Sequence, residues 1–198
     1  MILPITLASG SSSRRALLQN AGVRADATKP GVDEDQLKEV MRSEGLDVAE
    51  QAMRLADAKA LNVSQSTSGL VIGGDQMLGL GSRAFDKPNG MEGVRQHLRD
   101  LSGKCHILET AIAVAEDGKI VWRHLERPSL TVRTLSDEFI DHYLAVVDQD
   151  VCNTVGGYKL EGIGIQLFSK IEGDYFSILG LPLIPLLDYL RDRQVIPR

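Results

Sequence analysis

Cysteine, histidine and aromatic residues are scarce in this chain, and each scarcity excludes a class of protein. Of 198 residues, two are cysteine and four are histidine, and aromatic residues make up 5%. Cys105 and Cys152 form no CxxC pair and the histidines show no HxxxH spacing, so we expect neither a disulfide framework nor a structural zinc site. Two isolated thiols favour a reducing, cytoplasmic setting.

Positive charge and long apolar runs are also in short supply. Lys and Arg number 22 against 27 Asp and Glu, so the net charge is −5. We therefore expect neither a nucleic-acid polymer nor an anionic membrane as partner, and any anion site must be a local basic cluster. Gly and Pro interrupt the most apolar stretch, residues 176–187, and no basic segment precedes the first apolar run, so neither a membrane span nor a signal peptide is predicted.

What remains is the composition of an ordinary globular protein, 43% apolar and 25% charged, with periodicities that alternate between strand and helix. A chain of this length buries roughly 70% of its unfolded surface without a metal or disulfide. We expect one domain over residues 1–198, an α/β fold with a mixed sheet. The expected strands cover residues 2–8, 69–80, 105–115 and 119–134, the last two joined at Asp117-Gly118, and the expected helices cover 14–22, 34–44, 47–63, 91–100, 136–147 and a segment after Pro182.

A strand, a small-residue loop and a helix follow one another around residues 9–15. Small residues let a backbone approach a ligand, and the free N–H groups of a helix start attract anions. Arg14 and Arg15 oppose the helix dipole there, which favours a nearby anion. A solvated loop with both arginines pointing outward is an equally good interpretation of this segment alone.

Two ionisable residues interrupt apolar patterns and are candidates for a buried site. Lys59 falls inside the apolar arc of the helix expected over 47–63, where its stem could snorkel outward or its ammonium could meet a buried anion; we favour the second. Asp75 follows the apolar run Leu70–Gly74, where it could serve as a turn residue or as a functional carboxylate at a strand end.

Residues 32–34 form a second acidic group, and residues 79–84 form a misleading glycine pattern. Asp33 and Glu34 could cap the following helix, or, with Asp75, hold Mg²⁺ against a polyphosphate. Gly79–Ala84 fits the dinucleotide pattern GxGxxA, but the Pro-Asn-Gly that ends at Gly90 is turn chemistry rather than a helix opening. We therefore expect no dinucleotide site there.

Taken in order, short blocks along almost the whole chain resemble the signatures of the Maf family of nucleotide pyrophosphatases. The blocks are Leu7–Leu18, Val32–Glu34, Leu55–Ala60, Ile72–Gln76, Lys87–Pro88, Leu101–Lys104, Glu172–Tyr175 and Gly180–Leu183. The resemblance implies a two-lobed α/β fold with a long mixed β-sheet flanked by helices, related to the inosine triphosphate pyrophosphatases, and a homodimer. It further implies hydrolysis of a nucleoside triphosphate to the monophosphate and pyrophosphate, dependent on Mg²⁺ or another divalent cation such as Mn²⁺.

The same resemblance assigns roles to individual positions. It implies phosphate binding by Ser9, Arg14 and Lys59, metal binding by Glu34 and Asp75, activation of the attacking water by Asp75, and a substrate contact by Lys87. These roles agree with the interpretation of the residues themselves, because cations neutralise a leaving pyrophosphate while a base aligns water.

Gln76 and Glu161 bear on which base is bound. One branch of the family, associated with dTTP and UTP, has Thr and Gln there, whereas Gln and Glu resemble the branch that acts on 7-methyl-GTP. A carboxylate accepts hydrogen bonds without donating, which suits the N1–H and N2–H₂ groups of guanine and repels the carbonyl oxygens of uracil. Methylation at N7 makes the base cationic and strengthens such a pair. Glu161 could equally be a solvated loop residue.

Three departures from the family pattern concern the substrate more than the reaction. Ser12-Ser13 stand where Pro and then Arg or Trp are common, so a side chain expected beside the base is missing. Gly74 and Asp86 replace an Ala or Ser and a Gly. The leading interpretation is a nucleotide pyrophosphatase, and the alternatives are a dTTP/UTP pyrophosphatase, a non-catalytic nucleotide-binding regulator of septum formation, and a phosphate-binding structural module.

Overall fold

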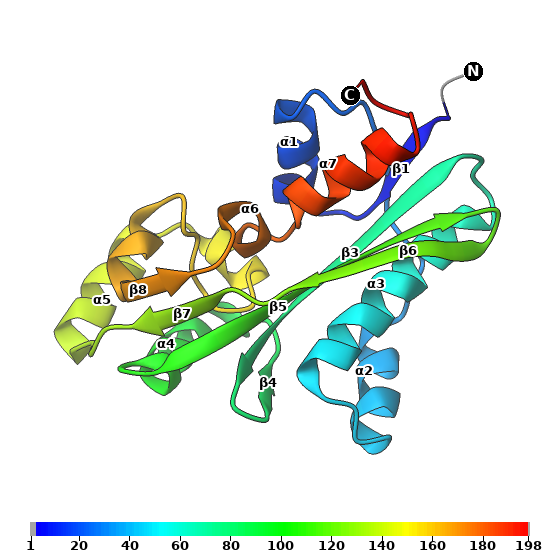
Figure 1. Ribbon diagram of the computed structural model, residues 1–198. Helices are drawn as coiled ribbons and strands as arrows, with labels where there is room; N and C mark the ends of the chain where they lie inside the picture. Colours follow the sequence, from blue (N-terminus) through cyan, green and yellow to red (C-terminus); the bar gives the residue numbers. More distant parts are fainter. Residues whose placement is uncertain (1–2, 198) are drawn as a thin grey trace.

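The computed structural model describes residues 3–197 as an α/β fold around one mixed sheet of eight strands (Figure 1). The strands are β1 (Ile5–Ala8), β2 (Asp26–Thr28), β3 (Leu70–Leu80), β4 (Arg83–Phe85), β5 (Cys105–Glu116), β6 (Lys119–Glu126), β7 (Ser129–Val132) and β8 (Phe168–Glu172). The helices are α1 (Ser12–Asn20), α2 (Glu34–Ser43), α3 (Val48–Ser64), α4 (Gly90–Leu101), α5 (Asp137–Val146), α6 (Tyr175–Ile178) and α7 (Leu183–Asp192), with 3₁₀ turns η1 (Gln149–Asn153) and η2 (Ile163–Leu167).

Two long strands, β3 and β5, run antiparallel through the whole molecule and divide it into two halves. At one end β3 pairs in parallel with β1, which pairs in parallel with β2, and β5 pairs with β6. At the other end β3 pairs with β4, and β5 pairs with β7, which continues to β8. The mixed sheet and the two-lobed, helix-flanked fold expected from the sequence are therefore confirmed.

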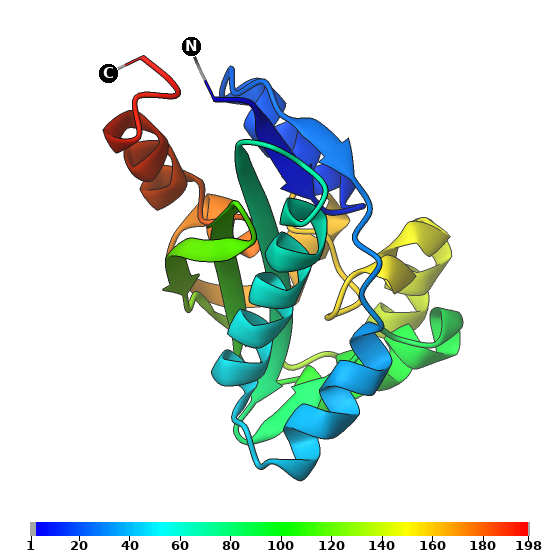
Figure 2. The same ribbon diagram turned by 90° about the vertical axis from the view of Figure 1, so that its right-hand side faces the viewer.

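Each half has its own hydrophobic core, and α3 packs on β3, β5 and β6. In one cluster, buried side chains of α4, α5 and β7 pack together, and in a second, those of β1, α1 and α7. A third lies under α3, which runs along the sheet with α2 beside it (Figure 2). Side chains at the junctions thus come from several elements.

The approach of α3 to β3 is unusually close and depends on Gly73. A Cβ atom at Gly73 would lie 2.3 Å from the carbonyl oxygen of Ala56 and 2.6 Å from the amide nitrogen of Ala60. Only glycine admits a helix backbone this near to the strand. Because α3 crosses β3 here, residues 59 and 75 are brought together.

The sequence misses the short edge strands and misplaces one boundary. β2, β4 and β8 have three to five residues and mostly exposed or half-buried side chains, so they carry no alternating pattern. The strand expected over 119–134 is two strands, β6 and β7, separated at Pro128, whose ring nitrogen cannot donate to a ladder. The expected start of the first strand, residue 2, lies outside the described residues.

Turn chemistry explains two further points. Asp117 and Gly118 both have positive φ (50° and 73°), as the expected β5–β6 hairpin requires. The expectation that residues 88–90 do not open a helix is wrong, because Asn89 is the N-cap of α4. The dinucleotide pattern is nevertheless no helix-opening site, since its glycines form the β3–β4 hairpin.

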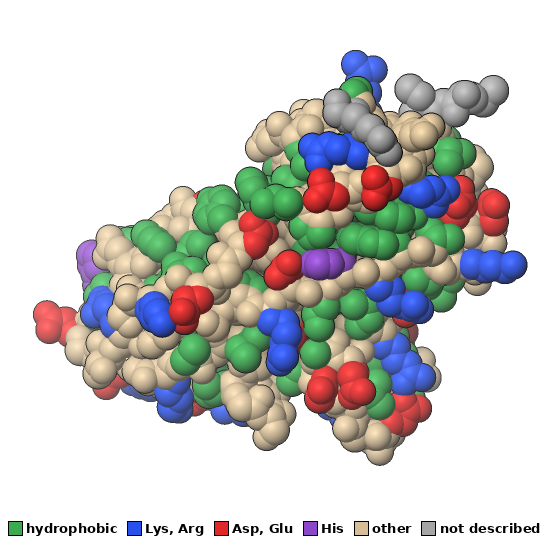
Figure 3. All heavy atoms as spheres, in the orientation of Figure 1, with side chains coloured by type: hydrophobic (Ala, Val, Ile, Leu, Met, Phe, Trp, Pro, Cys, Tyr) green, Lys and Arg blue, Asp and Glu red, His purple; other side chains and the backbone are tan. Residues whose placement is uncertain are grey.

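The surface matches the balanced composition. On the face drawn in Figure 3, acidic and basic side chains are interspersed and no extended patch has one sign. Within residues 3–197, every helix is too short or too polar to cross a membrane.

Candidate active site

The centre of the site is an ammonium group held between two carboxylates. Lys59 is 6% exposed, and its Nζ lies 2.6 Å from Oδ1 of Asp75 and 3.0 Å from Oε2 of Glu34. Asp75 is itself buried at 7% exposure, whereas the Glu34 side chain is 42% exposed. The helical wheel placed Lys59 on the core-facing arc, and its burial beside two anions confirms that the ammonium points inward rather than snorkelling.

Glu34 reaches this group because its neighbour Asp33 takes over the capping of α2. The Asp33 side chain accepts a hydrogen bond of 3.0 Å from the amide of Gln36, which leaves the Glu34 carboxylate free to turn toward Lys59. Burial alone would raise the pKa of Glu34, but the positive charges of Lys59, Lys38 and Lys87 outweigh it, so the pKa lies below its ordinary value. Glu34 is therefore ionised at neutral pH.

Arg14 points into the molecule, and Arg15 points out. The Arg14 Nε donates to the carbonyl oxygen of Gly180 at 2.7 Å, and one Nη donates to Ser9 Oγ at 3.2 Å. Burial lowers the pKa of Arg14, and the charges of Asp75 and Glu34 act in the opposite sense, which places the guanidinium within their field. The alternative of a solvated loop with outward arginines is wrong for Arg14 and correct for the exposed Arg15.

Two substitutions noted in the sequence have structural reasons in or near the site. A Cβ atom at Gly74 would lie 3.2 Å from Arg14 Nε, so glycine gives the guanidinium room. Asp86 accepts from Lys38 Nζ at 3.0 Å and from Arg42 at 2.7 Å, which ties α2 to the loop that carries Lys87. Lys87 itself is exposed, and its charge acts on Glu34.

Gln76 and Glu161 line one cavity, as the base-reading hypothesis requires. The cavity is lined by Ser13, Gln76, Leu108, Thr154, Val155, Gly156, Tyr158, Lys159, Leu160, Glu161, Ile178 and Leu179. Ser13, where the family commonly has a larger side chain, is half-buried and leaves this wall open.

The hydrogen-bond partners of Gln76 fix which of its polar atoms can face a ligand. The two hydrogens of its amide nitrogen are shared among three acceptors, Thr110 Oγ1 at 2.9 Å and the carbonyl oxygens of Ser177 and Ile178 at 2.9 and 3.1 Å. Thr110 gives its own proton to the Ser177 carbonyl at 3.0 Å, so all three partners act as acceptors. A flipped amide would place Oε1 against the carbonyl oxygens of Ser177 and Ile178, and two acceptors cannot bond to each other. Gln76 therefore offers its acceptor Oε1 to a ligand.

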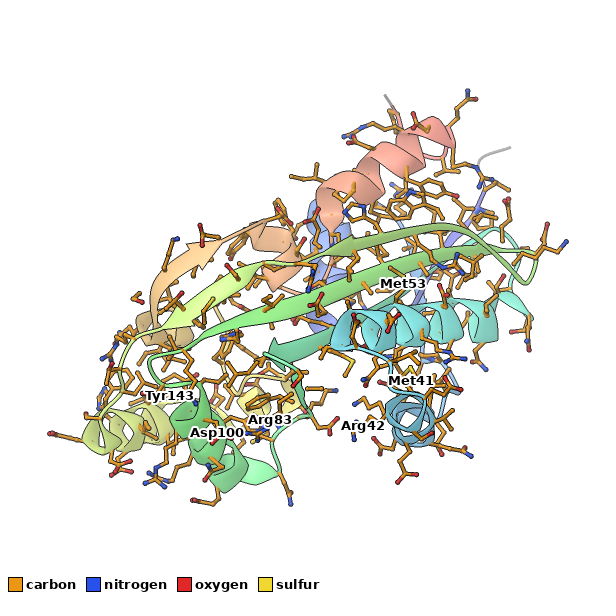
Figure 4. The ribbon with its side chains drawn as sticks, turned by 60° about the horizontal axis from the view of Figure 1, so that its bottom comes forward. Met41, Arg42, Met53, Arg83, Asp100 and Tyr143 are labelled. Atoms are coloured by element: carbon orange, nitrogen blue, oxygen red, sulfur yellow. The ribbon has the colours of Figure 1, made fainter. Side chains whose placement is uncertain are left out.

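The wall that carries Glu161 is anchored by residues that the sequence did not single out. Tyr158 and His106 share a buried hydrogen bond of 2.7 Å, and Tyr143 of α5, labelled in Figure 4, donates to the Gly157 carbonyl at 3.1 Å. Burial lowers the pKa of His106 to about 4, so the imidazole is neutral at physiological pH. In the sequence, Tyr158 is marked only by the Gly156-Gly157 pair directly before it. Glu161 is exposed, so its side chain reaches the cavity from the solvent side.

The half of the molecule that carries β4 and α4 has an ion pair away from this site. Arg83 of β4 lies beside Asp100 of α4 at 2.8 Å (Figure 4). Among residues 3–197, no three or more His, Cys, Asp or Glu side chains form a group that could enclose a metal ion.

Comparison with known proteins agrees with the geometry. The family model described as Maf-like protein matches residues 4–193. The chain is 59% identical over 197 residues to the nucleoside triphosphate pyrophosphatase of Hyphomonas neptunium, covering 100% of both chains. It is 48% identical over 189 residues to the 7-methyl-GTP pyrophosphatase of Rhizobium meliloti, covering 95% of each chain. With a match across nearly its full length, the chain belongs to the Maf family.

Proposed function

We propose that this protein hydrolyses a nucleoside triphosphate to the nucleoside monophosphate and pyrophosphate. The observation that carries the proposal is the buried Lys59 between Glu34 and Asp75, beside a strand–loop–helix unit whose Arg14 faces the same centre. Relatives at 59% and 48% identity are named for this reaction. A purely phosphate-binding module or regulator would need the cations but not the paired carboxylates.

The positive groups suit the phosphates of the substrate. Ser9 lies in the loop before α1 and Arg14 in its first turn, where free backbone N–H groups and a guanidinium fork complement phosphate oxygens. Lys59 would add a point charge from α3, and the exposed Lys87 would reach the substrate from the β4–α4 loop. Charge that develops on the leaving pyrophosphate is thereby neutralised.

Asp75 is the candidate base. Its carboxylate would orient a water molecule toward the α-phosphorus and accept a proton as the water oxygen forms its bond to phosphorus. The bond between the α-phosphorus and the oxygen that bridges it to the β-phosphorus then breaks, and pyrophosphate leaves with the bonding electron pair. Burial of Asp75 excludes competing bulk water, and the Lys59 ammonium at 2.6 Å holds its carboxylate in place.

The carboxylates of Glu34 and Asp75 fit a divalent cation such as Mg²⁺ or Mn²⁺. Both already converge on one positive charge, Lys59 Nζ, at 3.0 and 2.6 Å. Carboxylate oxygens are ligands that Mg²⁺ prefers, and phosphate oxygens and water usually complete its shell. When bound, the cation would neutralise phosphate charge and place the substrate against the carboxylates.

The cavity beside Gln76 favours a base with hydrogen-bond donors on its edge. Gln76 offers Oε1 and Glu161 offers a carboxylate, so both groups accept. Guanine presents N1–H and N2–H₂ side by side, whereas uracil and thymine present one N–H between two carbonyl oxygens. A cationic base strengthens the contact with Glu161, so we propose 7-methyl-GTP as the preferred substrate. A dTTP or UTP pyrophosphatase is the runner-up.

Pyrophosphate release from a panel of nucleoside triphosphates, with and without Mg²⁺, tests the reaction, the cation and the base together. Activity on no member of the panel contradicts the proposal. Glu161→Gln should lower kcat/KM for 7-methyl-GTP by about 1.5 kcal/mol, roughly tenfold, the low end for a charged hydrogen bond because Glu161 is exposed. Activity on UTP should fall less or rise. Equal losses on all substrates would contradict the role given to Glu161.

The proposal extends to organisation and setting. We propose that residues 1–198 form one Maf-like domain, in line with the family match over 4–193, and that two chains associate as a homodimer in the cytoplasm. The two free cysteines, Cys105 and Cys152, suit a reducing compartment. Light scattering after size exclusion tests the dimer, which requires twice the 21.6 kDa mass of one chain.

A further inference from the structure

A short turn near the C-terminal end of the chain touches both ends of the candidate site. It comprises residues 174–180 and includes α6, which lies between the half that carries α1 and α7 and the half that carries β7 and β8 (Figure 1). Glycines with positive φ bound it, Gly173 at 119° and Gly180 at 103°. Side chains rarely adopt these angles, so the chain enters and leaves the turn in conformations that suit glycine.

At one end the turn holds Gln76. The carbonyl oxygens of Ser177 and Ile178 accept from the Gln76 amide nitrogen at 2.9 and 3.1 Å, and Thr110 of β5 donates to the Ser177 carbonyl at 3.0 Å. These bonds decide that Gln76 presents Oε1 to a ligand. The turn thus sets the polarity of that part of the base cavity through its backbone alone.

At the other end the same turn holds Arg14. The carbonyl oxygen of Gly180 accepts from Arg14 Nε at 2.7 Å, and Ser9 accepts from the same guanidinium at 3.2 Å. With Nε occupied, the fork is fixed in one plane and its remaining N–H groups are aimed by the turn. Gln76 and Arg14 come from different elements, β3 and α1, yet both take their orientation from these seven residues.

One carboxylate holds the turn in shape. Asp174 is the N-cap of α6, and its Oδ2 accepts from both the amide and the hydroxyl of Ser177 at 2.7 Å. Ser177 is fully buried, so a lost bond there is not replaced by solvent. The Ser177 carbonyl that holds Gln76 belongs to the same residue.

We propose that the turn 174–180 is a positioning element that couples base recognition to phosphate binding, and that Asp174 is the positioning residue that keeps it in place. The proposal rests on the proposed function. When the Asp174 cap is lost, the three carbonyl oxygens lose their fixed positions. Gln76 and Arg14 then lose their orientation together, although neither has been changed.

The test compares three variants in two measurements. Asp174→Ala removes both bonds to Ser177, Asp174→Asn keeps an oxygen that accepts them, and Asp47→Ala removes the N-cap of α3, where the Asp47 side chain accepts from the Glu50 amide at 2.8 Å. The first measurement is the ratio of kcat/KM for 7-methyl-GTP to that for UTP. The second is the affinity for inorganic pyrophosphate by calorimetry, which needs Arg14 but no base and no turnover.

Asp174→Ala should lower the substrate ratio at least fivefold and weaken pyrophosphate binding at least threefold. Asp174→Asn and Asp47→Ala should stay within twofold of wild type in both. The inference is overturned if Asp174→Ala changes only one measurement, if it lowers activity equally on all substrates with pyrophosphate binding intact, or if Asp47→Ala gives the same result.

The test still decides if Asp174→Ala does not fold or if the wild-type protein has no activity. If Asp174→Ala does not fold, Ser177→Ala removes only the hydroxyl bond, and shifts of at least twofold in both measurements are then expected, with no shift overturning the inference. If wild-type protein releases pyrophosphate from no triphosphate, the proposed function fails on its own. The inference is then decided by calorimetry of Asp174→Ala and Asp47→Ala, with the affinity ratio of 7-methyl-GTP to UTP in place of the kcat/KM ratio and pyrophosphate binding as before.

Discussion

Replacing Lys59 with methionine removes the ammonium group that lies between Glu34 and Asp75. Methionine has a similar length and no charge, so the packing of α3 against β3 is kept while the ion pairs are lost. Two carboxylates then face each other, and one of them, Asp75, is only 7% exposed. We expect a large loss in the free energy of unfolding.

The magnitude follows from the two distances. At 2.6 Å and an effective dielectric constant of 20, the attraction between Lys59 and Asp75 is about 6 kcal/mol. Desolvation of both groups offsets much of this, yet breaking a buried pair by removing one partner typically costs ~3–5 kcal/mol. The pair with Glu34, which is 42% exposed, adds about 1 kcal/mol at most.

Urea unfolding at pH 7.5 of Lys59→Met, Asp75→Asn and the double variant measures the pair directly. The double variant removes both buried charges, so it should be more stable than the sum of the single losses predicts, by about 2 kcal/mol or more. A coupling energy below about 0.5 kcal/mol would refute the buried pair. Lys59 would then be a solvated lysine whose stem alone is buried.

Three further predictions concern catalysis, pH and packing. Asp75→Asn should abolish pyrophosphate release while nucleotide binding by calorimetry persists, and more than a tenth of wild-type kcat would contradict its role, since positioned proton transfer contributes ~10²–10⁴-fold. As pH falls from 6.5 toward 4, His106 takes up a proton in the unfolded chain but stays neutral in the folded protein. The free energy of unfolding therefore drops by up to about 1.4 kcal/mol per pH unit. His106→Gln should remove this slope, and an unchanged slope contradicts the assignment. Gly73→Ala should lower the free energy of unfolding by more than 2 kcal/mol, because its Cβ would lie 2.3 Å from the Ala56 oxygen. The control Gly10→Ala, whose Cβ would meet nothing within 4 Å, should change it by no more than about 0.5 kcal/mol. Equal effects of the two variants would contradict the close approach of α3 to β3.

The sequence was informative where burial and charge conflict. Lys59 on an apolar arc and Asp75 after an apolar run each demand a partner, and the partners prove to be each other and Glu34. The expectation that Asp75 ends a strand or forms a turn is wrong, because it lies inside β3 opposite Ala111. The contact between Lys59 and Asp75 could not be predicted from either segment, because it depends on how close α3 comes to β3. Gly73 permits that approach, but a glycine in a strand has several possible meanings.

Contacts made by backbone carbonyl groups could not be predicted from the sequence. The turn 174–180 holds Gln76 and Arg14 through the oxygens of Ser177, Ile178 and Gly180, and a main-chain oxygen has no sequence signature. The edge strands β2, β4 and β8 were missed for a related reason. Their stability comes from pairing with longer neighbours, not from their own side-chain pattern.

The bond between Arg14 and Gly180 joins residues 166 positions apart, and this has a consequence for how the protein acquires activity. Local helices and the β5–β6 hairpin can form early, whereas contacts of such long separation form late because the whole intervening chain must already be ordered. A ribosome-bound chain that still lacks residues 174–180 holds Ser9, Lys59 and Asp75 but lacks the Gly180 carbonyl that accepts from Arg14 Nε. Nascent chains should therefore gain their fold in steps and their competence for substrate only in the last of them.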